Sequence, residues 1–456
     1  MPKSFRPSAH FDPADPTEHE AQSPPDHQLE SLESRTMLTV FTVTNTNDAG
    51  AGSLRDALTQ SNNHAGVDTI AFNISASTKV IRPASPLPEV WDPATIDGTT
   101  QPGFAGKPLV QVDGTNAGTK ANGFKLWGGS TLRGLSVTNF AVDGVDLLNR
   151  GKLAGNVVRG MWIGLNLAGQ VAGNYGQSLL IWKSPNNVVG GINAADRNVI
   201  SGSRSHGTLG VLIMGSAATN NRIEGNYIGT DPTGAFARPN AGTGVGLQDA
   251  PNNVIARNLI SGNGEDGILI FKSGAKGNAV QGNLIGTDAT GTRAIANGMY
   301  GIEIQSANNA VGGKRGRMLN VISGNAKAGV VLWTAGATWN TIRGNYIGTN
   351  VRGTAKVGNG EQGVALSSAT GNAIRGNLIA GNKLEGVGVF TSGNNSITWN
   401  TIGFSTTGSV LTNGTWAVTM VGGSNQNLVG SNVIATHPTA LFENSGINRI
   451  VGNTVR

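Results

Sequence analysis

The side chains in this sequence that could carry out chemistry are few and scattered. The acidic candidates lie in or beside short apolar segments, and they are Asp143, Asp146, Glu265, Asp266 and Glu303, with Lys125 or Lys272 as the accompanying base. Paired carboxyl groups about 5–10 Å apart act as acid and base on glycosidic bonds, and Ca²⁺ needs about 6–8 oxygen ligands. No motif in the sequence joins these residues, so we identify no catalytic set.

Two aspartates in matching loops are the candidates for a metal. Asp231 and Asp288 follow the same Gly-Thr pair, and Asn350 takes the third copy of the position. A position that accepts Asp or Asn is typical of turns held by side-chain hydrogen bonds to the backbone. We therefore predict no metal site and no cofactor, with Ca²⁺ at these loops as the alternative. His206 is interpreted as a loop histidine.

The composition excludes several classes of protein. The 456 residues include 68 Gly and no Cys, and only 13% are charged. A helical bundle would have less glycine, and a disulfide scaffold needs cysteine. An apolar fraction of 38% is too high for a disordered coil. The net charge is +6, but there is no run of Lys or Arg, so we predict no nucleic-acid partner.

The amino-terminal segment differs in composition from the rest. Residues 1–36 are rich in proline and acidic side chains, which predicts a disordered leader. They contain no apolar stretch of the kind found in a conventional signal peptide. No transmembrane segment is predicted in the chain.

Two phrases alternate through most of the sequence. The first is typified by NAVQGNLIG from Asn278, and the second is an apolar pentapeptide usually opened by glycine, such as GVVLW from Gly329. Apolar and polar residues alternate with period two in both phrases, and β-branched residues are frequent, which is typical of strands. Successive pentapeptides are about 21 to 34 residues apart, a solenoid period. The sequence therefore predicts an all-β parallel β-helix of about twelve coils, with at least two strands in each coil.

The turns between these strands contain recurring asparagines. Identical amides stacked one per coil can hydrogen-bond along the axis of a solenoid. We expect one such column to contain Asn221, Asn253, Asn278, Asn309, Asn340, Asn372 and Asn395. Some turns carry insertions, residues 229–240 and 286–297, which should project as loops from one edge.

The part before the repeats predicts a cap. Residues 53–63 favour a short helix, because Ser53 can serve as its N-cap and Leu54, Ala57 and Leu58 fall on one face. A helix here would cover the open end of the first coil. We divide the chain into a leader (1–36), an N-terminal cap with irregular first coils (37–118) and regular repeats (119–456).

One outward-facing column is rich in aromatic residues. If the second and fourth residues of each pentapeptide face inward, the fifth faces outward, and this column extends from Trp127 to Met420. Its aromatic members are the candidate ligand-binding residues Trp127, Trp182, Phe271, Trp333 and Phe390. Exposed aromatic rings on a rigid sheet can stack on sugars or bury a partner surface. The alternative is that this position starts the turn or lies under loops.

Several segments resemble a known family. The stretch FTVTNTNDAGAGSLRDALTQSNNHAGVDTIAF from Phe41, with the later phrases NVISGN and GNYIGTDPTG, is similar to bacterial right-handed parallel β-helix repeat proteins, which share the pectin-lyase-like fold. The resemblance covers about residues 39–456. The preceding LESRTML, Leu32 to Leu38, resembles a short signature of large bacterial surface proteins, which implies an extracellular or cell-surface location.

These observations favour a non-catalytic surface or secreted β-solenoid, adhesin-like, that binds a polysaccharide or a surface protein through the aromatic column. The resemblance implies a second hypothesis, a polysaccharide lyase or glycoside hydrolase of the pectin-lyase-like fold. A purely structural spacer is the third.

Overall fold

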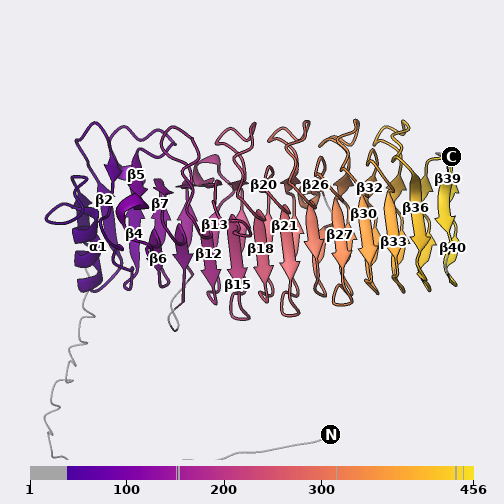
Figure 1. The fold of residues 1–456 in the computed structure, drawn as a ribbon, viewed down its shortest axis with the longest axis horizontal. Coiled ribbons are helices and arrows are strands. Elements are labelled where there is room, and N and C mark those ends of the chain that lie inside the picture. The colour runs from indigo at the N-terminus through magenta and orange to yellow at the C-terminus, as the bar shows by residue number, and fades with distance from the viewer. Residues whose placement is uncertain (1–37, 150, 152–154, 315, 437–438, 445) are drawn as a thin grey trace, which may run out of the picture. The chain divides into compact units, whose positions relative to one another are not determined.

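The structure, a computed structural model, describes residues 38–456 except 150, 152–154, 315, 437–438 and 445. The predicted leader, residues 1–36, lies outside the described residues. Leu38–Arg456 forms one unit, a solenoid in which each coil contributes a strand to each of three parallel sheets (Figure 1). The sequence predicted at least two strands per coil; the repeated Asn phrase supplies two of the three, separated by a two-residue turn.

Sheet A has 15 strands. They are β1 (Val40–Val43), β2 (Asp68–Phe72), β4 (Ala94–Asp97), β7 (Thr131–Arg133), β10 (Val157–Arg159), β13 (Val188–Gly190), β16 (Arg222–Glu224), β19 (Val254–Ala256), β22 (Ala279–Gln281), β25 (Ala310–Gly312), β28 (Thr341–Arg343), β31 (Ala373–Arg375), β34 (Ser396–Thr398), β37 (Leu428–Gly430) and β40 (Arg449–Val451).

Sheet B has 14 strands. They are β3 (Val80–Ile81), β5 (Val110–Asp113), β8 (Leu135–Thr138), β11 (Trp162–Ile163), β14 (Val199–Ile200), β17 (Tyr227–Ile228), β20 (Leu259–Ile260), β23 (Leu284–Ile285), β26 (Val321–Ile322), β29 (Tyr346–Ile347), β32 (Leu378–Ile379), β35 (Thr401–Ile402), β38 (Val433–Ile434) and β41 (Thr454–Val455).

Sheet C has 12 strands, which matches the predicted number of coils. They are β6 (Phe124–Leu126), β9 (Val145–Leu147), β12 (Leu179–Trp182), β15 (Val211–Met214), β18 (Val245–Gln248), β21 (Ile268–Phe271), β24 (Ile302–Ile304), β27 (Val330–Trp333), β30 (Val364–Ser367), β33 (Val387–Phe390), β36 (Trp416–Val421) and β39 (Thr439–Glu443).

The predicted capping helix is confirmed as α1 (Leu54–Asn63). The Ser53 hydroxyl accepts a hydrogen bond of 3.1 Å from the Asp56 backbone N–H, which satisfies one of the free donors of the first turn. Leu54, Ala57 and Leu58 are buried, and the helix packs on β1 and β2 at the end of the solenoid. Within the described residues no helix is long and apolar enough to cross a membrane.

The core consists of aliphatic columns inside the coils. Strands alternate inward and outward residues, so the middle residue of each sheet A strand faces the core. Ile223, Ile255 and Val280 stand in register on neighbouring coils, and none has any exposed surface. Because each coil buries its apolar face only against the next, stability depends on stacking.

The glycine that opens the sheet C pentapeptide is required by close packing. A Cβ at Gly301 would lie 2.5 Å from the Gly329 carbonyl oxygen and 2.8 Å from the Asn325 amide nitrogen. Neither distance is compatible with a side chain, which explains why glycine stands at most entries to sheet C, with Ser178 and Ala417 as exceptions.

Asparagines occupy all three corners of the solenoid. The predicted column is confirmed before sheet A, where for example the Asn221 side-chain N–H donates to Asn253 Oδ1 at 3.0 Å. A second ladder follows sheet A (Asn198, Asn226, Asn258, Asn283, Asn320, Asn345, Asn377, Asn400, Asn432 and Asn453). A third precedes sheet C (Asn240, Asn263, Asn297, Asn325, Asn359, Asn382 and Asn413). These ladders satisfy buried turn groups that would otherwise lack partners.

The insertions after sheet B form a ridge along one edge, as predicted (Figure 1). Antiparallel bridges such as Thr230–Ala237 and Thr287–Ala294 fold each insertion into a hairpin. The hairpins occur on alternate coils, and each touches the next across the intervening coil: Ala289 N–H donates to Gly234 O at 3.0 Å and Val351 N–H to Gly291 O at 2.9 Å. The structural repeat is therefore a pair of coils.

Breaking one rung of a ladder should destabilise the solenoid. Asn283 has no exposed surface, and its Oδ1 accepts hydrogen bonds from the Asn258 backbone N–H (2.9 Å) and side chain (3.1 Å). N283A leaves the buried Asn258 backbone N–H without an acceptor, at a cost of about 1 to 3 kcal/mol, while the Asn258 side chain keeps its bond to Ile223 O. We expect a clearly lower denaturation midpoint by circular dichroism, whereas N47A, at an exposed asparagine, should leave it unchanged. Equal midpoints for the two variants would show that the ladder adds no stability.

Candidate functional site on the outer face of sheet C

The outer face of sheet C carries the residues that the sequence singled out. Val330 and Leu332, the second and fourth residues of their pentapeptide, are fully buried, while Trp333, the fifth, is exposed. The third residue also faces outward, because side chains alternate along a strand. Sheet C thus presents two outward columns, one at the third and one at the fifth position.

The aromatic column lies partly open to solvent. Trp182 is 41% exposed and Trp333 46% exposed, while Phe271 and Phe390 are half-buried. Trp127 is half-buried and stacks on Trp91, with ring centroids 4.9 Å apart. The two exposed indoles are therefore not covered by loops.

The carboxyl-terminal end of this column differs from the prediction. Met420 is fully buried, because Val421 and not Met420 pairs with Phe390. β36 is six residues long, and the pentapeptide within it starts one residue later than the sequence predicted. Met420 is therefore its fourth residue, which faces the core.

Asp143 and Asp146 form a buried carboxyl pair at one end of the face. Asp146, in β9, is opposite Lys125 of β6, and its Oδ2 accepts a hydrogen bond from the Asn122 side chain. Asp143 Oδ1 accepts from the Gln177 backbone N–H at 2.5 Å. Burial and the neighbouring Asp143 charge raise the pKa of Asp146 to about 8, and burial also raises the pKa of Asp143.

The proton held at this pair has an identifiable location. Asp146 is 4% exposed, and its Oδ1 has no hydrogen-bond partner among the described residues. Burial and the hydrogen bond with Asp143 both favour the protonated form of Asp146, so the proton lies within the carboxyl pair. The Asp146 carboxyl group is covered by the protein rather than open to solvent.

A second carboxyl group lies further along the solenoid. Asp266 is buried and accepts a 3.0 Å hydrogen bond from the Tyr300 backbone N–H. Burial and the charge of Glu303, followed by that of Glu265, raise the pKa of Asp266 to about 7. His206 lies 3.4 Å from the Glu265 carboxylate with its ring exposed.

The structure thus divides the predicted acidic candidates into two groups. Three strands of sheet C, β12, β15 and β18, separate the group at β9 from the group at β21 and β24. Lys125 adjoins the first group and bonds Glu89 at 3.4 Å. Lys272 follows β21 and forms no ion pair within the described residues.

Asp231 and Asp288 stabilise their own hairpins. Asp231 Oδ1 accepts from the Ala235 and Phe236 backbone N–H groups, both at 3.0 Å, and Asp288 Oδ1 accepts from Thr292 N–H at 3.0 Å. These and the neighbouring threonine hydroxyls outweigh partial burial and lower the pKa of both aspartates. In the described part of the chain, no three His, Cys, Asp or Glu side chains are grouped so as to hold a metal ion.

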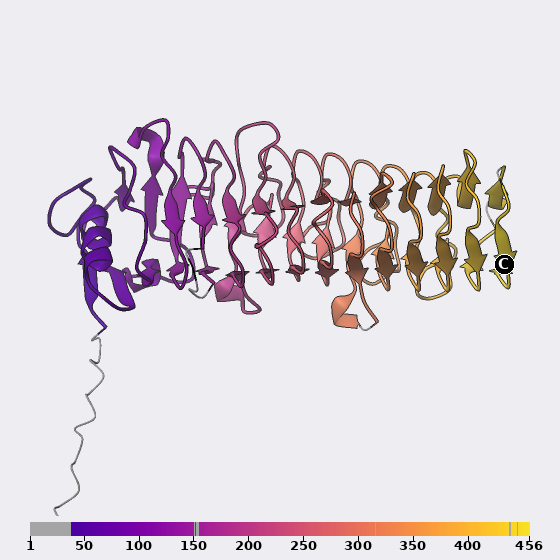
Figure 2. The ribbon, with the colours of Figure 1, turned by 90° about the horizontal axis from the view of Figure 1, so that it is seen from below.

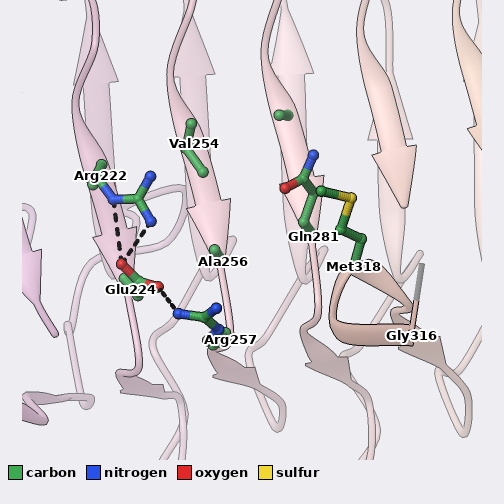
Figure 3. Close-up of a pocket in the computed structure, with 9 residues that line it drawn as sticks. Arg222, Glu224, Val254, Ala256, Arg257, Gln281, Gly316 and Met318 are labelled. Atoms are coloured by element: carbon green, nitrogen blue, oxygen red, sulfur yellow. Dashed lines mark hydrogen bonds and ion pairs between the residues drawn. The ribbon is translucent and has the colours of Figure 1, made fainter. Parts of the chain in front are cut away.

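Sequence reasoning missed the arginines on the outer face of sheet A. Figure 3 shows Glu224 between Arg222 and Arg257, at 2.7 and 2.6 Å, in a groove of about 710 Å³. The segment η4 (Gly316–Met318) forms one wall of this groove, and Met318 lies over Gln281 (Figure 3). A similar groove of about 690 Å³ lies beside η3 (Ala194–Asp196), and both segments project from the same side of the solenoid (Figure 2).

A signal for this face was present in the repeat. The phrases NTIRGNYIG and NAIRGNLIA carry Arg343 and Arg375 at the same position, two residues before the asparagine of the second ladder. Period-two alternation places that position outward on sheet A. A search for linear runs of Lys and Arg cannot detect charges that come together only when coils stack.

Comparisons with known proteins agree with this architecture. A family model described as periplasmic copper-binding protein (NosD) matches residues 164–311. No curated protein matches the chain. The described histidines do not suggest a copper site, because His64 bonds Asp68 and Thr39 beside α1, whereas His206 lies in a distant coil.

Several solved structures are similar to the chain. A point mutant of the periplasmic alginate epimerase AlgG is 13% identical, covers 91% of this chain and 85% of its own, and has a TM-score of 0.50. The AlgE4 A-module, a mannuronan C-5 epimerase of Azotobacter vinelandii, is 16% identical over 90% of this chain and 95% of its own, with a TM-score of 0.46. An alginate lyase of Paenibacillus sp. str. FPU-7 is 12% identical over 90% and 99%, with a TM-score of 0.39. The chain is a right-handed parallel β-helix of the pectin-lyase-like fold.

Proposed function

We propose that the protein is a non-catalytic polysaccharide-binding solenoid whose binding surface is the outer face of sheet C. The observation that carries this proposal is the exposure of Trp182 and Trp333 on a sheet whose strands are held in fixed register. Indole rings on a rigid surface bind flat apolar ring faces with little loss of conformational entropy. Phe271 and Phe390 extend the same column.

The surroundings of the two tryptophans favour a sugar chain as the ligand. The Lys183 ammonium lies 5.1 Å from the Trp182 ring, and Tyr300 lies 6.4 Å from Trp333, so polar groups border each ring. Between them the third-position column carries three apolar or small residues, Leu212, Gly246 and Leu269, followed by the carboxylate of Glu303. A long, shallow surface of this kind fits an extended polymer better than a compact protein domain.

The comparisons support the same class of ligand and a location in the cell envelope. The AlgG structure is named as a periplasmic alginate epimerase, and the matching family model is named as periplasmic. A location in the periplasm or outside the cell follows from the proposal, since polysaccharides are abundant there.

Removing the two exposed indoles should abolish binding. Affinity electrophoresis identifies the neutral polysaccharides that slow the migration of the wild type. For these polysaccharides we expect W182A/W333A to have at least about tenfold lower affinity, because each indole supplies a stacking contact. The control is F236A, which removes an exposed aromatic ring from a hairpin after sheet B. Unchanged retention of W182A/W333A would contradict the proposal, and failure of the wild type to bind any glycan would favour the structural spacer.

The Asp143–Asp146 pair favours a second candidate function, acid catalysis on a glycan. A general acid needs a carboxyl group whose pKa is raised toward neutral pH, and burial raises the pKa of Asp146 to about 8. Trp127, directly after β6, stacks on Trp91 and donates a 2.8 Å hydrogen bond to Glu89.

The protonation of Asp146 can be tested through stability. An aspartate whose pKa rises from 3.8 in the unfolded chain to about 8 in the folded protein lowers stability as the pH increases from about 4 towards 8. D146N removes this effect, so its melting temperature should exceed that of the wild type at pH 8 but not at pH 4. D231N should be destabilised at neutral pH instead, because the folded-state pKa of Asp231 is lowered. Equal pH profiles for D146N and the wild type would refute a neutral Asp146.

The catalytic candidate requires product formation. Incubation of bound glycans with the wild type, with and without Ca²⁺, would yield new reducing ends or unsaturated products, and D146N would yield about 100-fold less. If no product forms from any glycan that binds, the site is not catalytic and the binding function alone stands.

A further inference from the structure

We infer that the outer face of sheet A carries a separate site for an acidic polysaccharide, formed by Arg343 and Arg375 between Trp339 and Trp399. This inference does not depend on the function proposed for sheet C. It rests on the arginine pairing and on the backbone conformation of the two tryptophans.

Arg343 and Arg375 are adjacent and lack counter-charges. They stand opposite each other in β28 and β31, on strands about 4.8 Å apart. Among the described residues no carboxylate lies within 4.0 Å of either guanidinium. Like charges directly opposite on a sheet are destabilising, so folding alone does not account for this pair.

Four other arginines of this face are paired with acids. Arg133 lies 2.5 Å from Asp97, and Arg159 lies 3.7 Å from Asp196. Arg222 and Arg257 share Glu224. The chain therefore supplies acids elsewhere on the same face and omits them at Arg343 and Arg375, where a ligand carboxylate would complete the pair with bidentate hydrogen bonds.

Two tryptophans border this arginine pair in an unfavourable backbone conformation. Trp339 precedes β28 with φ 57° and is 70% exposed; Trp399 follows β34 with φ 61° and is 62% exposed. Corresponding positions in other coils carry residues that tolerate a positive φ, such as Asn220, Asn308 and Gly376. A bulky residue in this conformation is strained, which points to a use for the ring rather than for the turn.

The Trp339 ring is positioned as a platform. A Cβ at Gly371, in the next coil, would lie 3.3–3.4 Å from three atoms of the indole, so one face of the ring covers this glycine. The high exposure of Trp339 leaves the other face open to solvent. A sugar ring could stack there while its carboxylate reaches the guanidinium groups.

The limited extent of the charge favours an acidic polysaccharide over a nucleic acid. The neighbours in register with the arginines are Gly312 on one side and Thr398 on the other, so the uncompensated charge is confined to two strands. A nucleic-acid strand needs a positive groove that follows successive phosphates. Two arginines between two separate rings suit a uronate residue with sugars on either side.

Binding to polygalacturonate tests this inference, with fully methyl-esterified polygalacturonate as the uncharged match. We expect the acidic polymer, but not the ester, to slow the migration of the wild type in affinity electrophoresis. R343Q/R375Q and W339A should each bind at least about tenfold more weakly, because each loses a charge-assisted or stacking contact. R449Q, at an exposed arginine of β40, should bind the acidic polymer as the wild type does.

Three outcomes would overturn the inference. Equal retention of R343Q/R375Q and the wild type would mean that the arginines do not bind the polymer. A fall of several degrees in the melting temperature of R343Q/R375Q would assign the pair a structural role, since removing like charges should leave stability unchanged or raise it. If single-stranded oligo(dT) bound more tightly than polygalacturonate, and R343Q/R375Q weakened that binding, the surface would be a nucleic-acid site. Loss of neutral-glycan binding in W182A/W333A alone would leave this site intact, so the two proposals fail separately.

Discussion

The structure depends on the hydrogen bonding of one coil to the next. Parallel pairing leaves every strand with a partner on each side except at the ends, and buried corners would still expose unpaired turn groups. The three asparagine ladders solve this problem at each corner, because most of their amides donate to the asparagine of the next coil and accept from that of the previous one. Aliphatic columns between the ladders then exclude water from the interior.

The rigidity that results determines where function can reside. Inward positions are committed to the core, and the ladders occupy the corners, which leaves outward residues of the sheets and the inserted hairpins free to vary. The three carboxyl groups with raised pKa values, the exposed indoles of sheet C and the arginines of sheet A all occupy such outward or strand-entry positions. Each face therefore has its own chemical character, acidic and aromatic on sheet C and basic on sheet A.

Much of the fold was predictable from the sequence, because its determinants repeat. The periods of both phrases, the glycine before each pentapeptide and the asparagine column led directly to stacked coils, and Ser53 identified the cap. What could not be predicted depends on contacts between coils. The number of ladders, the phase shift that buries Met420 and the pairing of Arg343 with Arg375 appear only when one coil is placed on the next. The proton on Asp146 likewise depends on how deeply its strand is covered, which composition does not reveal.

The hairpin ridge has a consequence for how solenoids of this kind change length. From residue 230 onward each hairpin bonds its counterpart two coils away, as Thr406 N–H does with Gly353 O at 2.9 Å, while the intervening coil makes a tight turn. Gain or loss of a single coil would place a hairpin next to a hairpin, or leave a gap in the ridge. The unit that genes can duplicate or delete without disrupting the edge is therefore two coils, so homologous solenoids should differ in length by even numbers of coils.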